Sequence, residues 1–249
     1  MKKYEFTGEV KTYLGKTLHK IKAVVSFGIV VKGEIGGWIE SEKNLSQDGN
    51  AWVYSDAWVY SDARVYGNAR VSGNAEVSGN ARVYGNARVY GNARVYSDAE
   101  VSGNARVYGN ARVYGNARVY SDAEVSGNAR VYGNARVSGN AEVSGNARVY
   151  GNARVYGNAR VYSDAEVSGN ARVYGNAHFM VIGAIGSRFD FTTFFRNKEN
   201  GISVKCGCFY GTIAEFRAKV TETHGTDTKF AKVYQAAADL AEIQIELEK

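Results

Sequence analysis

The chain has 249 residues and a formal net charge of +6, with 29 Gly, 18 Tyr and no Pro. It contains no apolar run long enough for a transmembrane helix, and its basic start lacks the apolar core of a secretory signal. Its two cysteines, Cys206 and Cys208, lie too close together for an ordinary disulfide framework. We therefore expect no membrane association and a reducing, cytoplasmic location.

Composition divides the chain into three parts, residues 1–50, 51–176 and 177–249. The first has 8 Lys and Arg against 6 Asp and Glu, and the second has 14 Arg against 5 Asp and 5 Glu. The third has 9 residues of each sign. The basic excess is therefore modest and lies mostly in the middle part. We expect an N-terminal β cap, a repeat domain and a C-terminal α+β module.

The first part is predicted to cover one end of the repeat domain. Val24–Asn50 is rich in β-forming residues, and it ends on the Gly-Asn pair that recurs throughout the repeats. The end of a stacked array is an open sheet edge that recruits other chains unless something covers it. Val24–Asn50 is therefore expected to form the first cap.

The middle part repeats a six-residue unit. From Ala51 to Asn176 the pattern A-[RWE]-V-[YS]-[GS]-[ND] fits twenty-one times without a break. Ala and Val alternate with Arg and Tyr, which is the period of a strand with one buried face. Gly-Asn and Ser-Asp supply the turn. One unit cannot bury its own Val, so the units must coil and stack, with Ala and Val inward and Arg and Tyr outward.

Written from its Val, the unit is V-Y-G-N-A-R, with a large aliphatic residue followed four places later by a small one. In this pattern the chain resembles the hexapeptide-repeat superfamily. The resemblance implies a mainly β protein built as a left-handed parallel β-helix with three strands per coil. The array would then form about seven coils, and at about 4.8 Å per layer the prism would be about 34 Å long.

The last part is predicted to fold as a small α+β module. Phe189–Phe195 and Ile202–Phe209 have the pattern of a hairpin. Thr212 and Glu215 form a capping box for a helix that ends at Gly225. Residues 227–248 predict a second amphipathic helix.

Both flanks carry a further resemblance. The segments GGWIESEKNLSQDGNAWV and CGCFYGTIAEFRAKVTETHG, on either side of the repeats, resemble uncharacterised hexapeptide-repeat proteins of bacteria and their prophages. The resemblance implies a bacterial host cell and a role in phage–host interaction, but it implies no activity.

With three units per coil, every third unit lies on the same face. One face then carries Arg and Tyr in four consecutive layers without a Glu. These residues are Arg94, Tyr96, Arg112, Tyr114, Arg130, Tyr132, Arg148 and Tyr150, and we call them the Arg/Tyr stripe. The stripe is either a stable surface, in which Tyr ladders cover the backbone, or a binding surface for phosphates and exposed bases.

Charge decides which ligands the stripe favours. The repeats carry a net charge of +4, which falls short of the strongly basic footprint of a nucleic-acid-binding protein. A small anionic ligand or a protein partner is therefore favoured over a specific nucleic acid.

An enzymatic role is also considered, because many hexapeptide-repeat proteins are acyltransferases. The resemblance implies that such enzymes use a His base and a loop inserted between coils. Residues 51–176 contain no His and no insertion, although acid–base chemistry needs a positioned base. The three histidines outside the array, which we expect on the surface or in the caps, are His19, His178 and His224.

The segment KCGCF contains both cysteines, which are expected to be reduced structural thiols. Two alternatives stay open, a redox pair and a metal site shared with His224, although structural zinc uses four ligands. We expect no cofactor, no metal and no catalytic residue.

The sequence therefore favours a non-enzymatic binding or scaffold solenoid. It would act on a host factor or a small anionic or nucleotide ligand, and a homodimer or homotrimer fits this role. An acyltransferase-like enzyme is the alternative, and a nucleic-acid-binding protein is the third interpretation.

Overall fold

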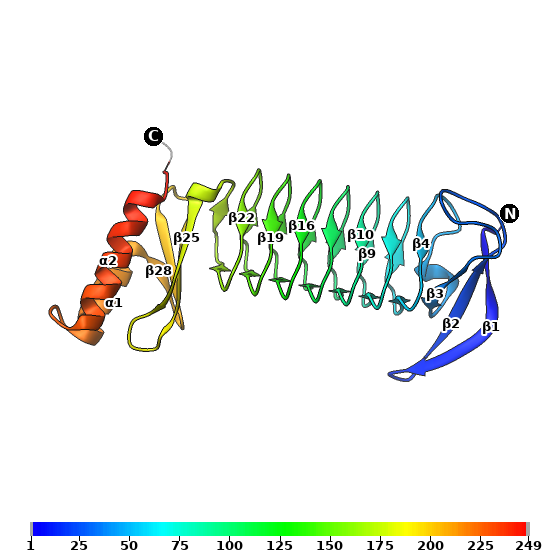
Figure 1. Ribbon diagram of the computed structural model, residues 1–249, viewed down its shortest axis with the longest axis horizontal. Coiled ribbons are helices and arrows are strands. Elements are labelled where there is room, and N and C mark those ends of the chain that lie inside the picture. The colour runs from blue at the N-terminus through cyan, green and yellow to red at the C-terminus, as the bar shows by residue number, and fades with distance from the viewer. Residues whose placement is uncertain (1, 248–249) are drawn as a thin grey trace.

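The computed structural model describes residues 2–247 and shows a straight rod (Figure 1). A β-solenoid forms the middle of the rod. A β cap with a projecting hairpin covers its N-terminal end, and a small sheet with two helices covers its C-terminal end. Among these described residues, no helix is both long and apolar enough to cross a membrane.

Each repeat unit contributes one short strand made of its second and third residues. The series begins with β4 (Trp52–Val53), β5 (Trp58–Val59) and β6 (Arg64–Val65) and advances by six residues per strand. It ends with β22 (Arg160–Val161), β23 (Glu166–Val167) and β24 (Arg172–Val173). The strands form three parallel sheets, each with seven strands from the array, so the predicted three-sided coil and its seven layers are confirmed.

The register between layers repeats every eighteen residues. Val95 of β11 (Arg94–Val95) pairs with Val113 of β14 (Arg112–Val113), and Val113 pairs with Val131 of β17 (Arg130–Val131). The Ala at the first position and the Val at the third position of every repeat unit are fully buried, so both residues line the core. The predicted inward direction of Ala and Val is therefore confirmed.

The turns between strands need a left-handed backbone. Gly109 has a φ of +68°, and Ser121 takes the same conformation with a φ of +62°. Glycine adopts this region freely, whereas a residue with a Cβ is strained there. The turn Asn side chains also stack, and Asn86 Nδ2 donates a hydrogen bond to Asn104 Oδ1 at 3.0 Å in the next layer.

The N-terminal cap extends one face of the solenoid. Strands β1 (Tyr4–Tyr13) and β2 (Lys16–Ala23) form an antiparallel hairpin that points away from the rod axis (Figure 1). β2 then pairs with β3 (Ile35–Ile39), which pairs in parallel with β5. The result is a single ten-stranded sheet that runs from the hairpin to β23.

The segment predicted to be the first cap, Val24–Asn50, holds only β3 and the short 3-10 turn η1 (Glu42–Asn44) as regular structure. Leu45 forms a bridge to Val65, so β3 and Leu45 make an incomplete eighth layer. The segment does cover the solenoid end, but most of the β structure comes from the hairpin before it, which lies within the β cap predicted for residues 1–50 although its strands were not predicted individually.

The C-terminal sheet has four antiparallel strands in sequence order: β25 (Phe179–Ile185), β26 (Asp190–Arg196), β27 (Ile202–Cys206) and β28 (Phe209–Thr212). The predicted hairpin corresponds to β26 and β27, which pair with each other, and is confirmed. β25 was not predicted. The 3-10 turn η2 (Asn176–His178) links the solenoid to this sheet.

Both predicted helices are present. α1 (Ile213–His224) begins at the capping box of Thr212 and Glu215 and ends at Gly225, as predicted. α2 (Lys229–Gln244) follows a Thr228 cap. Residue 248, the last of the predicted second helix, lies outside the described residues.

The junction between the solenoid and the C-terminal sheet is tightly packed. Phe179 and Phe195 belong to the same core cluster as the Ala and Val columns of the array. The backbone N–H of Glu166 donates a hydrogen bond to Thr193 Oγ1 at 3.0 Å. β26 therefore closes the last layer, which would otherwise be an open edge.

Candidate binding surface

The tyrosines of the Arg/Tyr stripe form a continuous ladder. Tyr96, Tyr114, Tyr132 and Tyr150 stack with ring centroids 4.9 Å apart and interplanar angles of 2°, 1° and 5°. The in-register strands impose this spacing, because residues directly opposite each other on neighbouring strands face the same side. Burial raises the pKa of Tyr96 and Tyr132, and burial and the charge of Glu166 raise that of Tyr150 to about 12.

The stripe's arginines are only partly available. Arg94 Nε lies 3.3 Å from Glu76 Oε2, and Arg148 Nη1 lies 3.0 Å from Glu166 Oε1. Tyr150 also donates a hydrogen bond to Glu166 Oε2 at 3.2 Å. Within residues 2–247, no carboxylate lies within 4.0 Å of the other two guanidinium groups, those of Arg112 and Arg130.

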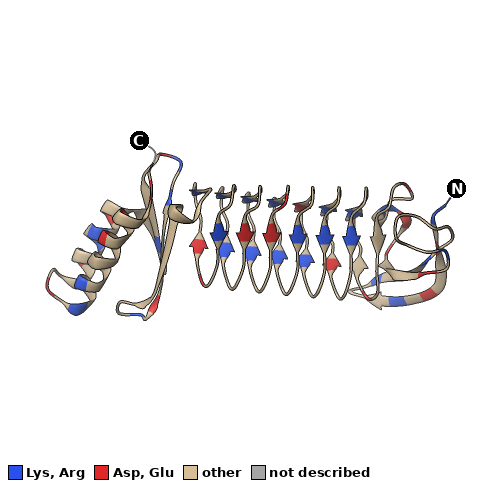
Figure 2. Ribbon diagram, turned by 45° about the horizontal axis from the view of Figure 1, so that its top comes forward, with Lys and Arg blue, Asp and Glu red and all other residues tan. Residues whose placement is uncertain are grey.

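The structure thus brings the eight predicted residues together on one face, while the acidic layers above and below neutralise half of the cations. Figure 2 shows this face as a run of basic strands with an acidic strand at each end. We call the sheet that runs from β6 to β24 the third face. Glu100 on this face shows the same principle, since it lies 3.6 Å from both Arg82 and Arg118.

The longest run of arginines without a carboxylate partner lies on the third face. Within the described part of the chain, Arg136, Arg154 and Arg172 have no acidic side chain within 4.0 Å. They occupy three consecutive layers of parallel, in-register strands. Sequence reasoning missed this run because it required Tyr in every layer and left out the ion pairs made by the flanking Glu residues.

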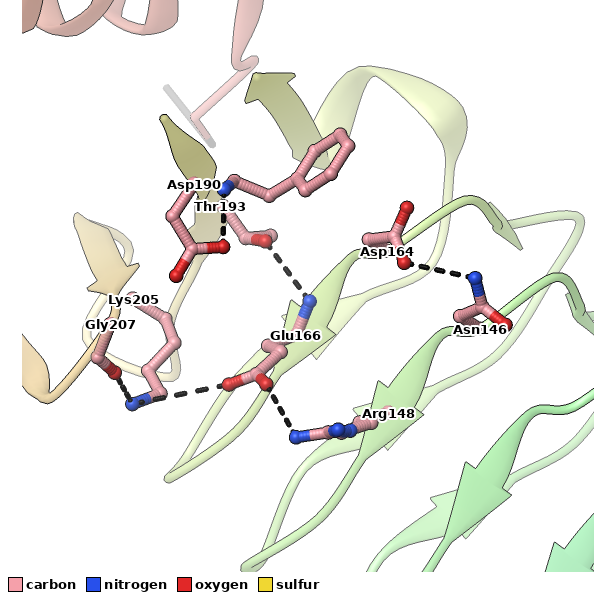
Figure 3. A pocket seen from close by; sticks show the side chains of 9 residues that line it. Asn146, Arg148, Asp164, Glu166, Asp190, Thr193, Lys205 and Gly207 are labelled. Carbon is pink, nitrogen blue, oxygen red and sulfur yellow. Dashed lines mark hydrogen bonds and ion pairs between the residues drawn. The ribbon is translucent and has the colours of Figure 1, made fainter. Parts of the chain in front are cut away.

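A polar cavity of about 410 Å³ lies where the stripe meets the C-terminal sheet (Figure 3). Its lining residues are Asn146, Arg148, Asp164, Glu166, Asp190, Phe191, Thr193, Lys205 and Gly207.

The charged groups of this cavity already have partners within it. Asp164 accepts a hydrogen bond from Asn146 at 3.0 Å, and Asp190 accepts one from the backbone N–H of Phe191 at 2.8 Å. Lys205 Nζ donates to the carbonyl of Gly207 and lies 3.9 Å from Glu166. The cavity therefore joins two modules through paired charges, and only Arg148 comes from the predicted stripe.

The histidines lie in the caps, as expected. His178 is buried, and its Nδ1 accepts a hydrogen bond from the backbone N–H of Tyr174 at 3.3 Å. His224 ends α1 and stacks on Tyr234, and His19 stacks on Phe6. None of the three lines the 410 Å³ cavity.

Both cysteines are free thiols, and they do not share a strand face. Cys206 ends β27 and its Sγ accepts a hydrogen bond from Thr192 Oγ1 at 3.2 Å, whereas Cys208 is exposed in the following turn. Among the described residues there is no group of three or more His, Cys, Asp and Glu side chains placed to hold a metal ion.

Comparison with known families finds a match within the repeats. The family described as YdcK Beta solenoid repeat matches eight segments, which are residues 63–79, 87–103, 111–127, 123–139, 129–145, 141–155, 153–167 and 165–178. No curated protein matches the chain. The matched repeats and the three-sided rod agree, and together they identify the chain as a repeat β-solenoid protein.

Proposed function

We propose that the protein is a non-enzymatic binding and scaffold rod that holds two terminal modules at a fixed separation. One observation carries the proposal: a single sheet runs from β1 to β23, and β26 is bonded to β23 at its far end. The N-terminal module is therefore joined to the rod through backbone hydrogen bonds of one sheet. The C-terminal module is joined through the hydrogen bond from Glu166 to the Thr193 side chain, the bridge between Ala171 and Asn197, and a shared core, not through a linker.

The surface chemistry also supports binding over catalysis. The faces present the same Arg, Tyr and Glu groups in successive layers, whereas a catalytic site needs one set of groups with unlike environments. Burial raises the pKa of the ladder tyrosines Tyr96, Tyr132 and Tyr150, which favours their neutral form and a structural role. An acyltransferase remains the alternative function, and acyl-donor binding tests it.

The partner in this proposal is a host-cell protein or a small anionic ligand in the bacterial cytoplasm. This choice follows the resemblance of the flanks to prophage proteins and the modest positive charge of the repeats. Specific nucleic-acid binding is disfavoured by the same charge, because phosphate contacts dominate the affinity of such complexes. A homodimer or homotrimer is part of the proposal.

Capture of native partners tests the scaffold role. The full chain is purified from bacterial cells after lysine cross-linking, and bound molecules are identified by mass spectrometry. We expect cross-links from one assembly to both ends of the rod, for example to Lys22 and to Lys232.

Deletion of residues 105–122 removes one coil and preserves the register, because layers repeat every eighteen residues. The variant should melt close to the parent and be shorter by about 4.8 Å. Assemblies that bridge both ends should weaken, whereas partners of one end should stay bound. The scaffold role would be contradicted if partners bound one module alone and if the shortened variant captured them as well as the parent does.

A further inference from the structure

The third face ends in a concentration of positive charge. Arg136 of β18 (Arg136–Val137), Arg154 of β21 (Arg154–Val155) and Arg172 of β24 pair in register. Neighbouring strands lie about 4.8 Å apart, and like charges directly opposite each other are destabilising. Elsewhere on the rod, a Glu in the next layer supplies a counter-charge at the end of a run of arginines, as Glu166 does for Arg148. These three arginines have no such neighbour among residues 2–247.

The C-terminal module adds a fourth cation to this end. A bridge between Ala171 and Asn197 holds the β26–β27 turn against the last coil. Lys198 of this turn lines a cavity of about 90 Å³ together with Arg154 and Arg172. Glu199 lies 3.3 Å from Lys198 Nζ and neutralises it in part, but Glu199 does not line the cavity.

The Asn ladder beside the cavity ends with unused donors. Asn134 Nδ2 donates to Asn152 Oδ1 at 3.3 Å, but within the described chain Asn152 Nδ2 has no side-chain acceptor. On another edge of the solenoid the ladder ends on an acid, since Asn146 donates to Asp164. Asn152 and Asn170 both line the cavity, so its lining is rich in donors and contains no carboxylate.

We propose that this cavity, lined by Asn152, Arg154, Asn170, Arg172 and Lys198, binds the phosphate group of a phosphate monoester. Guanidinium groups suit phosphate because each presents a planar fork of donors to its oxygens. The cavity is small, about 90 Å³, and is the smallest of those described here. In this proposal it holds a single phosphate group, and the remainder of the ligand extends into solvent. The inference rests on the proposed binding role and gives it a site and a ligand class.

The opposite end of the same face offers a useful contrast. There Lys43, Arg64 and Arg82 line a wider cavity of about 470 Å³. Arg82 is held by Glu100 at 3.6 Å, so that end already has its counter-charge close by. On the sheet that runs from β4 to β22, Arg70 and Arg88 pair in register, and within the described chain neither has a carboxylate partner. These two arginines line none of the cavities described above, so they make a charge-matched control.

The test is a calorimetric titration of the full chain with inorganic phosphate at constant ionic strength. We expect one saturable site. The double variant Arg154→Gln/Arg172→Gln should weaken binding by at least about tenfold, since hydrogen bonds to charged groups are lost. The control Arg70→Gln/Arg88→Gln should stay within about twofold of the parent, because it removes the same charge from another face, away from the cavity. Thermal melts confirm that both variants fold.

Two further probes identify the source of the phosphate. O-phosphoserine and a nucleoside monophosphate are titrated in the same way, and equal affinity for all three shows that only the phosphate group is recognised. If one of the two probes binds with higher affinity than inorganic phosphate, its chemical class is identified as that of the ligand.

Three outcomes would overturn the proposal. The first is that phosphate shows no saturable binding, and the second is that both double variants lose the same affinity. The third is that Arg64→Gln, at the opposite end of the face, abolishes binding while Arg172→Gln does not. None of them bears on the scaffold role, which partner capture tests separately.

Discussion

Replacing one core Val by a charged residue most directly tests the assignment of Val to the inside and Tyr to the outside of each strand. Val113 has no exposed surface and lies between Val95 and Val131 in the inward column. In Val113→Asp, a carboxyl group that stays neutral there would need its pKa raised by about 3–5 units. At pH 7 the cost of keeping it protonated is about 1.36 kcal/mol for each pH unit above the unfolded pKa of about 3.9, which is about 4 kcal/mol, and two lost methyl groups add about 1.6 kcal/mol.

The sum of about 6 kcal/mol is comparable to the whole stability of an ordinary domain, about 5–15 kcal/mol. We therefore expect the variant to lose at least its central layers. Its neighbour Tyr114 points outward, and Tyr114→Ser removes two ring stacks worth about 0.5–1.5 kcal/mol each. The native chain already carries Ser at this position in other units, such as Ser126 and Ser138.

Denaturant unfolding followed by circular dichroism measures both variants, with the nearly isosteric Val113→Thr as a control of intermediate cost. Hydrogen exchange locates the loss, because layers of a solenoid unfold with their neighbours. Equal losses for Val113→Asp and Tyr114→Ser would refute the assignment of the two faces of each strand.

Three other predictions concern pH, backbone strain and ligands. Burial raises the pKa of Tyr60 and Tyr150 to about 12, above the value of about 10 in an unfolded chain. Their stabilisation should be complete below pH 10 and lost as the pH rises towards 12. Melting curves and ultraviolet titration measure this, and phenols that titrate at about 10 would contradict it. Ser121→Gly should raise stability by about 1 kcal/mol in urea, because Ser121 occupies a left-handed turn; a loss would show that its side chain stabilises the turn. Acetyl-CoA should not shift the melting temperature, whereas a ligand at a hundred times its Kd stabilises by about 2.7 kcal/mol, and such a shift would favour the acyltransferase.

The repeats made the solenoid predictable because one local rule recurs in every unit. Val at the third position and a turn at the fifth and sixth determine strand, direction and register together, and the pairing of Val95 with Val113 follows from three units per coil. The capping box of Thr212 and Glu215 was equally local, and α1 begins there.

The remaining elements depend on tertiary neighbours. The β1–β2 hairpin is mostly exposed along β1, so its sequence has no strong alternation of apolar and polar residues. β25 has an almost continuous apolar run, FMVIGAI, which does not distinguish a strand from a buried helix segment. The position of Lys198 beside Arg172 depends on how the β26–β27 turn docks on the last coil, which no local pattern encodes.

The three-sided coil also controls orientation about the rod axis. Each unit turns the chain by one side, and every unit offers almost the same upper and lower surface to its neighbours. Loss or gain of a single unit within the array would keep each turn and each buried Val, but it would rotate the C-terminal module by about a third of a revolution relative to the N-terminal hairpin. Recombination among such similar units would therefore change the orientation of one end of the molecule relative to the other, while the structure of each end stays unchanged.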